Sequence, residues 1–147
     1  MRRFSMVDIA PKKTVAREAV AVGEIKLKDD TIARLKSGRI EKGDAIAAAE
    51  VAAIMAAKNT PRILPFCHSI TITTVRTEHR ISRNTFRVES YVKGEAKTGV
   101  EMEALTAASA YLLTIWDMTK QYEKDANGQY PSTAITNLRV TRKIKGR

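Results

Sequence analysis

Two β-branched segments that follow each other closely are the strongest constraint on the fold. Residues 70–80 and 86–96 are rich in strand-forming side chains, and the short polar link Ser82-Arg83-Asn84 lies between them. In the second segment apolar or small side chains alternate with polar ones, so one face is predicted to be buried. The residues of that face are Phe86, Val88, Ser90 and Val92. The short link predicts that the two strands form an antiparallel hairpin.

Helical patterns lie on both sides of this hairpin. Residues 45–58 are rich in alanine, with Asp44 as the predicted N-cap and Asn59-Thr60-Pro61 as the predicted end. Residues 100–122 form the longest predicted helix. Shorter elements are predicted at 14–22 (a helix closed by Gly23), 25–28 (a strand), 30–38 (a helix capped by Asp30) and 134–142 (a strand ending in a basic tail at about 141–147).

The order of these elements favours an α+β fold with a mainly antiparallel sheet covered by helices. A chain of 147 residues, 44% of them hydrophobic, suits one domain over residues 1–147 with a sizeable core. Cys67 is the only cysteine, which excludes an intrachain disulfide framework, and a structural zinc site of four Cys and His ligands is improbable. No apolar stretch is long enough to span a membrane, and the basic N-terminus lacks the apolar core of a secretory signal. We therefore expect a cytoplasmic protein.

The formal net charge of +10 requires an anionic partner. Nucleic acid, a membrane surface and a small polyanion all satisfy that requirement. The sequence contains neither a Gly-rich nucleotide-binding loop nor an RNA-recognition signature, and few aromatic residues are present to stack on bases. Several of the surplus cations follow Asp125, the last acidic residue, namely Arg139, Arg142, Lys143, Lys145 and Arg147.

Two segments before the hairpin carry candidate functional residues. Lys42 and Gly43 stand just before the N-cap of the Ala-rich helix, where the helix dipole favours an anion, although the alternative is a solvated lysine. In Pro65-Phe66-Cys67-His68, the histidine could carry a proton near neutral pH. The cysteine could be a nucleophile only with a base and an acidified thiol. The plainer alternative is a buried thiol beside a hydrogen-bonded core histidine.

The longest predicted helix carries two further candidate pairs. Thr98 and Glu101 have capping-box spacing, which would give Glu101 a structural role. Glu101 and Glu103 diverge by ~200° on a regular helix, so they reach one ligand only where the backbone is still leaving the extended strand. Asp117 and Lys120 share a helix face. They form either a surface ion pair or a partly buried acid–base pair with perturbed proton affinities.

Together these segments resemble the cyclic pyranopterin monophosphate synthase family, the molybdenum cofactor biosynthesis protein C type. The likeness runs from residue 6 to about residue 143. Its marks are Arg17-Glu18-Ala19, Lys42-Gly43-Asp44, Pro65-Phe66-Cys67-His68 and the runs 56–60, 97–106 and 115–120. The resemblance implies a ferredoxin-like sandwich and a hexamer built from dimers. It also implies a lyase that converts 3′,8-cyclo-7,8-dihydroguanosine triphosphate into cyclic pyranopterin monophosphate and pyrophosphate.

The resemblance also assigns roles to residues. Asp117 and Lys120, with Lys42, would carry the catalytic work. The implied substrate-binding residues are Phe66, Cys67, His68, Glu101, Met102 and Glu103, with Lys58 as a weaker phosphate contact. No metal site and no cofactor is expected, although Mg²⁺ could accompany the triphosphate.

One expectation comes from helix geometry. Asp117 lies 16 residues beyond Glu101, which is ~24 Å along a straight helix. Either the helix breaks, or one active site takes Glu101 from one subunit and Asp117 from its neighbour; we predict the shared site.

Two other functions compete with the enzyme as explanations of the sequence. A basic nucleic-acid-binding protein would bind with strong salt dependence, but it leaves Glu101, Glu103 and Asp117 unexplained. An oligomeric scaffold would leave Lys42, His68 and Lys120 replaceable. The charge excess therefore fits a pocket for one triphosphate better than a surface that binds a polymer.

Overall fold

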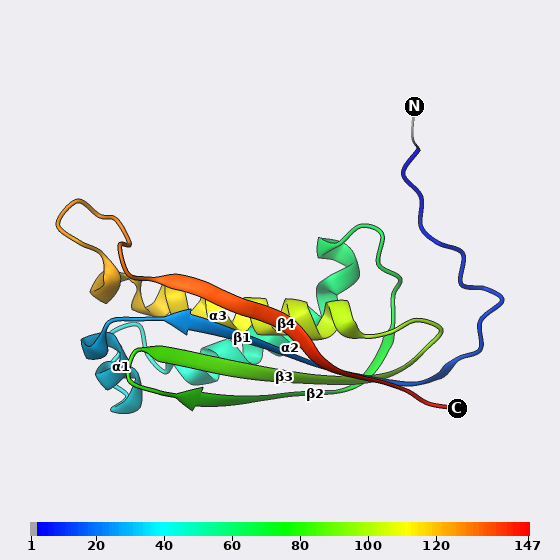
Figure 1. The fold of residues 1–147 in the computed structure, drawn as a ribbon, viewed down its shortest axis with the longest axis horizontal. Coiled ribbons are helices and arrows are strands. Elements are labelled where there is room, and N and C mark those ends of the chain that lie inside the picture. The colour runs from blue at the N-terminus through cyan, green and yellow to red at the C-terminus, as the bar shows by residue number, and fades with distance from the viewer. Residues whose placement is uncertain (1–2) are drawn as a thin grey trace.

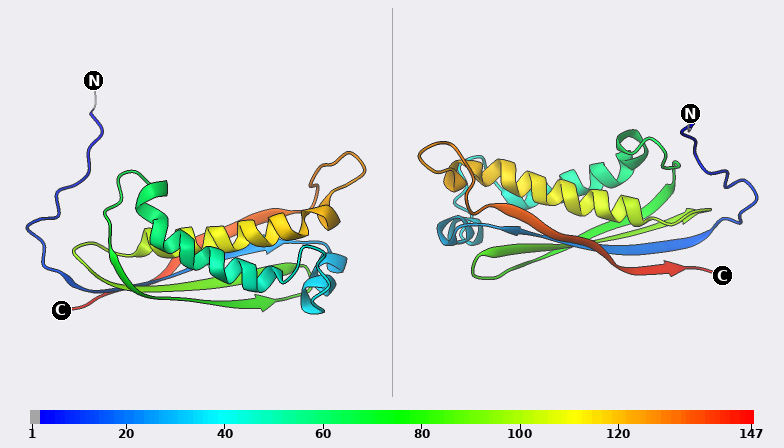
Figure 2. Two further views of the ribbon diagram at one scale, coloured as in Figure 1. Left: turned by 180° about the vertical axis from the view of Figure 1, so that it is seen from behind. Right: turned by 45° about the horizontal axis from the view of Figure 1, so that its top comes forward.

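A four-stranded antiparallel sheet forms one layer of the molecule, and two long helices lie across one of its faces (Figures 1 and 2). The computed structural model describes residues 3–147, so Met1 and Arg2 of the basic N-terminus lie outside the described residues. The elements are β1 (Val15–Lys26), α1 (Asp29–Lys36), α2 (Ala45–Ile63), β2 (Thr71–Ile81), β3 (Thr85–Ala96), α3 (Glu101–Glu123) and β4 (Ala134–Lys145). The strand order β2-β3-β1-β4 is that of a ferredoxin-like sandwich, which confirms the predicted fold class.

The predicted hairpin is confirmed by β2 and β3. The two strands pair antiparallel from Thr71 opposite Glu95 to Ile81 opposite Phe86. The predicted inner face of β3 is buried throughout, because it packs beneath the helices. The alternation of side chains along β3 was therefore sufficient to orient it.

The helix predicted at 14–22 is wrong, because these residues belong to the central strand β1. This strand pairs with β3 along its whole length and with β4 on its other edge. Ala19 and Ala21 lie in the core, where small side chains let α3 pack closely on the sheet. Gly23 continues the strand instead of ending a helix. Of the short strand predicted at 25–28, residues 25 and 26 are the end of β1, and residues 27 and 28 lie beyond it. Pairing on both edges therefore outweighs the helix propensity of alanine.

Helix α2 begins as predicted but ends later. The Asp44 carboxylate accepts hydrogen bonds from the main-chain N–H groups of Ile46 and Ala47, at 3.1 and 3.0 Å. The helix then continues through Pro61 to Ile63. The side chains of Asn59 and Thr60 donate to main-chain carbonyls one turn earlier, at 2.8 and 3.0 Å. A proline this close to the C-terminus disturbs only the last turn, which explains why it does not stop the helix earlier.

Three predicted ends also differ from the structure. The N-cap of α3 is Val100 without a side-chain cap, so the predicted capping box is wrong; Glu101 pairs with Lys143 instead. The N-cap of α1 is Lys28, and Asp30 lies in the first turn, where it pairs with Arg34. Much of the predicted basic tail belongs to β4, which extends to Lys145 because β1 is long enough to pair with it.

Candidate active site

The side chains of Lys42, Asp117 and Lys120, which we call the acid–base cluster, meet at the C-terminal half of α3. The Lys120 Nζ lies 2.8 Å from Asp117 Oδ1, and the Lys42 Nζ lies 3.1 Å from Oδ2. Lys42 also donates to the main-chain oxygen of Asp117 at 2.8 Å. It lies in the loop between α1 and α2, just before Gly43, whose φ of +115° favours glycine. The structure thus brings together the three residues predicted to be catalytic.

Asp117 is an exposed member of an ion-paired cluster. Its side chain is 58% exposed and pairs with Lys120, so of the two alternatives left open by the sequence the surface ion pair is the one observed. Hydrogen bonds from Lys120 and then Lys42 lower the pKa of Asp117, and Asp117 in turn raises the pKa of Lys120. At neutral pH the pair therefore rests as a carboxylate and an ammonium, able to accept and to donate a proton respectively.

A cavity of about 670 Å³ opens at the other end of α3. It lies between the segment that precedes β2 and the first turn of α3. Six predicted substrate-binding residues line it, namely Phe66, Cys67, His68, Glu101, Met102 and Glu103. The seventh, Lys58, is exposed on α2 and is not among the lining residues. We call this space the N-terminal cavity.

Two carboxyl groups whose pKa values are shifted in opposite directions face the N-terminal cavity. Burial is the largest single influence on Glu101 and acts to raise its pKa. The hydrogen bond and charge of Lys143, a main-chain hydrogen bond and the charge of Arg17 together outweigh burial and lower the pKa. Glu103 is 2% exposed, and within residues 3–147 its Oε2 has no hydrogen-bond partner. Burial, reinforced by the charge of Glu101, raises the pKa of Glu103. Because Glu101 is the first residue of α3, both side chains reach one cavity despite their spacing.

Cys67 and His68 belong to the wall of the N-terminal cavity and not to the core. Both are only half-buried. Burial and then the nearby charge of Glu103 raise the pKa of the Cys67 thiol, so the thiol stays protonated and is a poor nucleophile. The neighbouring Phe66 is half-exposed and stacks on Phe4 with ring centroids 6.0 Å apart. This wall supplies contact surface and one imidazole.

A second cavity of about 720 Å³ adjoins the first, and we call it the basic cavity. Lys12, Thr98 and Gly99 line both cavities. The cations around the basic cavity are Lys12, Lys13, Arg17, Lys97, Lys143, Lys145 and Arg147. Arg17 is 7% exposed, and within the described residues its Nε has no partner. Such a concentration of cations can bind a polyanion.

Sequence reasoning missed part of the basic cavity. It treated Arg17 only as a mark of the resemblance and did not single out Lys12, Lys13 or Lys97. The available signals were the Lys12-Lys13 doublet and the position of Lys97 beside Thr98 and Gly99. For the C-terminal cations, the sequence allows either a phosphate-binding or a solvated role.

The described residues contain neither a cluster of metal ligands nor a membrane-spanning helix. Across residues 3–147, no group of three or more His, Cys, Asp or Glu side chains could hold a metal ion. Over the same residues, no helix has both the length and the apolar character needed to cross a bilayer.

Comparison with known proteins identifies the family. The model of the MoaC family matches residues 6–146. A protein of Sulfurisphaera tokodaii, named "Probable cyclic pyranopterin monophosphate synthase", is 54% identical over 145 residues, which cover 99% of this chain and 96% of the relative. Proteins with the same name from Saccharolobus solfataricus and Methanococcoides burtonii are 56% and 52% identical, covering 95% and 97% of this chain and 94% and 90% of theirs. The chain belongs to the MoaC family.

Proposed function

We propose that the acid–base cluster and the two cavities together perform the activity that family membership assigns, that of a cyclic pyranopterin monophosphate synthase in molybdenum cofactor biosynthesis. The enzyme is a lyase, and its substrate is a nucleotide derivative. We infer that this substrate is 3′,8-cyclo-7,8-dihydroguanosine triphosphate. Its ring system would occupy the N-terminal cavity, and its triphosphate would extend into the basic cavity.

The two cavities match the two chemical halves of this substrate. The N-terminal cavity offers carboxyl groups of Glu101 and Glu103 to ring N–H groups and the imidazole of His68 as a proton carrier. The basic cavity offers ammonium and guanidinium groups to the phosphates and stabilises the departing pyrophosphate. The two cavities share three lining residues, so one extended ligand can occupy both.

We also propose that each active site is shared between two subunits. The observation that carries this proposal is that α3 is one unbroken helix of 23 residues. Glu101 and Asp117 therefore stay ~24 Å apart within one subunit, too far for one small substrate. The acid–base cluster of one subunit would act on the substrate held in the cavities of its neighbour.

The exposed side of α3 suits such a pairing. Between its two ends the helix exposes Met102 and Leu113, and the neighbouring α2 exposes Val51, Ile54 and Met55. Two copies of α3 that pack antiparallel about a two-fold axis near Ser109 would bring Glu101 of one copy to Asp117 of the other. The same apolar side chains would be covered by the contact.

Subunit mixing tests the shared site. Glu101→Ala and Asp117→Ala subunits, each inactive alone, are unfolded together, refolded in equal amounts and assayed for pyrophosphate release. Random pairing places one intact site in each mixed dimer, so about a quarter of wild-type activity should return. The matched control mixes Glu101→Ala with Glu103→Ala, whose defects lie in the same cavity, and should recover nothing. No recovery in the first mixture would refute the sharing.

The activity itself needs a separate assay. The folded wild-type protein is incubated with the cyclic dihydroguanosine triphosphate, and pyrophosphate is measured. Release by the wild type but not by Lys120→Ala supports the catalytic assignment, whereas no release by the wild type contradicts the proposed reaction. Four expectations stay predictions: the hexamer built from dimers, the binding of Mg²⁺ together with the triphosphate, the phosphate contact of Lys58 and the cytoplasmic location.

A further inference from the structure

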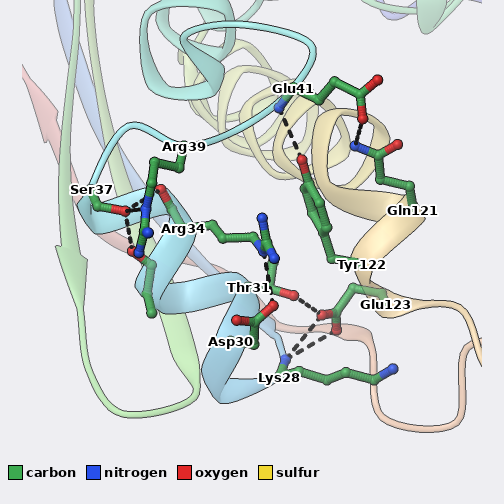
Figure 3. A network of polar contacts seen from close by, with 11 residues as sticks. Lys28, Asp30, Thr31, Arg34, Ser37, Arg39, Glu41, Gln121, Tyr122 and Glu123 are labelled. Carbon is green, nitrogen blue, oxygen red and sulfur yellow. Dashed lines mark hydrogen bonds and ion pairs between the residues drawn. The ribbon is translucent and has the colours of Figure 1, made fainter.

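The loop that carries Lys42 is fastened to the last turns of α3 (Figure 3). The Tyr122 hydroxyl accepts a hydrogen bond from the main-chain N–H of Glu41 at 2.9 Å. One residue earlier on the helix, Gln121 Nε2 donates to the Glu41 carboxylate at 3.0 Å. The residue immediately before Lys42 is therefore held to α3 through both its backbone and its side chain.

The Tyr122 ring is itself fixed in place. It is half-buried and packs against the hydrophobic core. The Arg34 guanidinium of α1 lies over the ring, 4.6 Å from its centroid, and Arg34 pairs with Asp30 at 2.9 Å. Packing on one side and the guanidinium on the other leave the phenol oxygen directed at Glu41, as Figure 3 shows.

The contact between Lys42 and Asp117 needs such an anchor. Both partners are exposed, with 41% and 58% of their side chains accessible, and an exposed ion pair contributes little free energy. A lysine side chain also loses considerable rotamer entropy when it is held in one place. The ion pair holds the loop only weakly, even with the hydrogen bond from Lys42 to the Asp117 main-chain oxygen. Buried Ile40 anchors the loop in the core, and the contacts of Glu41 then fix the backbone next to Lys42, which decides where the amine can reach.

From these contacts we propose that Tyr122 is a positioning residue, whose phenol oxygen fixes the backbone at Glu41 and so places the Lys42 amine beside Asp117. The catalytic meaning of that placement rests on the proposed function, but the placement itself does not. Sequence patterns around the acid–base cluster gave no sign of this role.

The variant Tyr122→Phe removes the acceptor and keeps the ring beneath Arg34. The matched control is Tyr91→Phe on β3, because Tyr91 also carries an arginine over its ring, Arg76, at 4.6 Å. Tyr91 points away from the helices, on the opposite face of β3 from Phe86 and Val92. Both variants lose one phenol oxygen from a stacked tyrosine, but only one loses the contact with Glu41.

The readout that does not depend on catalysis is the acetylation rate of Lys42, measured by mass spectrometry with trace acetic anhydride. Exposed Lys26 is the internal reference. Loss of one hydrogen bond should raise the relative rate at Lys42 about fivefold in Tyr122→Phe and leave it unchanged in Tyr91→Phe. Labelling of Lys42 at the wild-type rate in a folded Tyr122→Phe protein overturns the proposal.

Kinetics then connect the placement to catalysis. We expect kcat of Tyr122→Phe to fall about fivefold with little change in KM, because the cavities that bind substrate are untouched. Faster labelling with a wild-type kcat would show that Tyr122 places Lys42 but that this placement does not affect the reaction, which contradicts its catalytic meaning. If the wild type releases no pyrophosphate, the proposed function fails, while the labelling result still decides the placement of Lys42. Should Tyr122→Phe not fold, Gln121→Glu repels the Glu41 carboxylate and should raise Lys42 labelling in the same way.

Discussion

The carboxylate of Glu123 is a buried anion that should contribute strongly to stability. It is fully buried at the end of α3, and it accepts hydrogen bonds from the Lys28 main-chain N–H and the Thr31 hydroxyl (Figure 3). The Thr133 hydroxyl donates a third hydrogen bond to the same carboxylate. The N-cap of α1, Lys28, has no side-chain cap of its own. Glu123 therefore caps α1 from 95 residues away and joins α1, α3 and the loop before β4.

The variant Glu123→Gln keeps the shape of the side chain but removes the charge. One oxygen becomes an NH₂ group that points at donors, so at least one of the hydrogen bonds is lost and the others weaken. Hydrogen bonds to charged groups contribute ~1.5–3 kcal/mol each, and relief from burying a charge offsets part of the loss. We expect the free energy of unfolding to fall by about 2 kcal/mol. Glu123→Ala should cost about 4 kcal/mol, because the two buried threonine hydroxyls and the part-buried Lys28 N–H lose their acceptor.

Urea unfolding at one fixed protein concentration measures this loss, since assembly makes stability depend on concentration. With an m-value near 2 kcal/mol/M, Glu123→Gln should lower the midpoint by about 1 M. The control Glu50→Gln, at an exposed position on α2, should stay within about 0.5 kcal/mol of wild type. An equal midpoint for Glu123→Gln and the control would refute the argument that the buried charge stabilises the fold.

Two further predictions concern packing and pH. A Cβ at Gly23 would lie 2.7 Å from Leu112 Cδ1, so Gly23→Ala should lower the free energy of unfolding in urea by about 1–3 kcal/mol. Adding Leu112→Val should recover part of the loss, because it shortens the side chain that clashes. If the effects of the two substitutions simply add, the clash is not the cause. The pKa of Glu103 is raised in the folded state, so ionising the Glu103 carboxyl costs more in the folded than in the unfolded protein. The stability of the wild type therefore falls as the pH rises through the folded-state pKa. Glu103→Gln should therefore match wild type well below the ordinary glutamate pKa and exceed its stability by about 1 kcal/mol at neutral pH. A stability difference that does not change with pH would show that ionisation of Glu103 is not the cause.

Local patterns in the chain were enough for the elements whose signals lie within a few residues. Strict alternation located β3 and its buried face, Asp44 marked the start of α2, and the spacing of Asp117 and Lys120 placed them on one helix face. Each of these features depends on backbone periodicity or on a hydrogen bond between near neighbours, so the surrounding fold hardly alters it.

Other features depend on partners far apart in the chain, and only the tertiary structure could decide them. Residues 15–26 are a strand because β3 and β4 pair with both of their edges, although alanine favours a helix. Lys42 reaches Asp117 across 75 residues, and the basic cavity draws its cations from the N-terminal segment, β1, the end of β3 and the C-terminus. The physical reason is that the strand order determines which distant segments meet, and these meetings determine burial, ion pairing and proton affinity. Sequence spacing describes only neighbours along the chain.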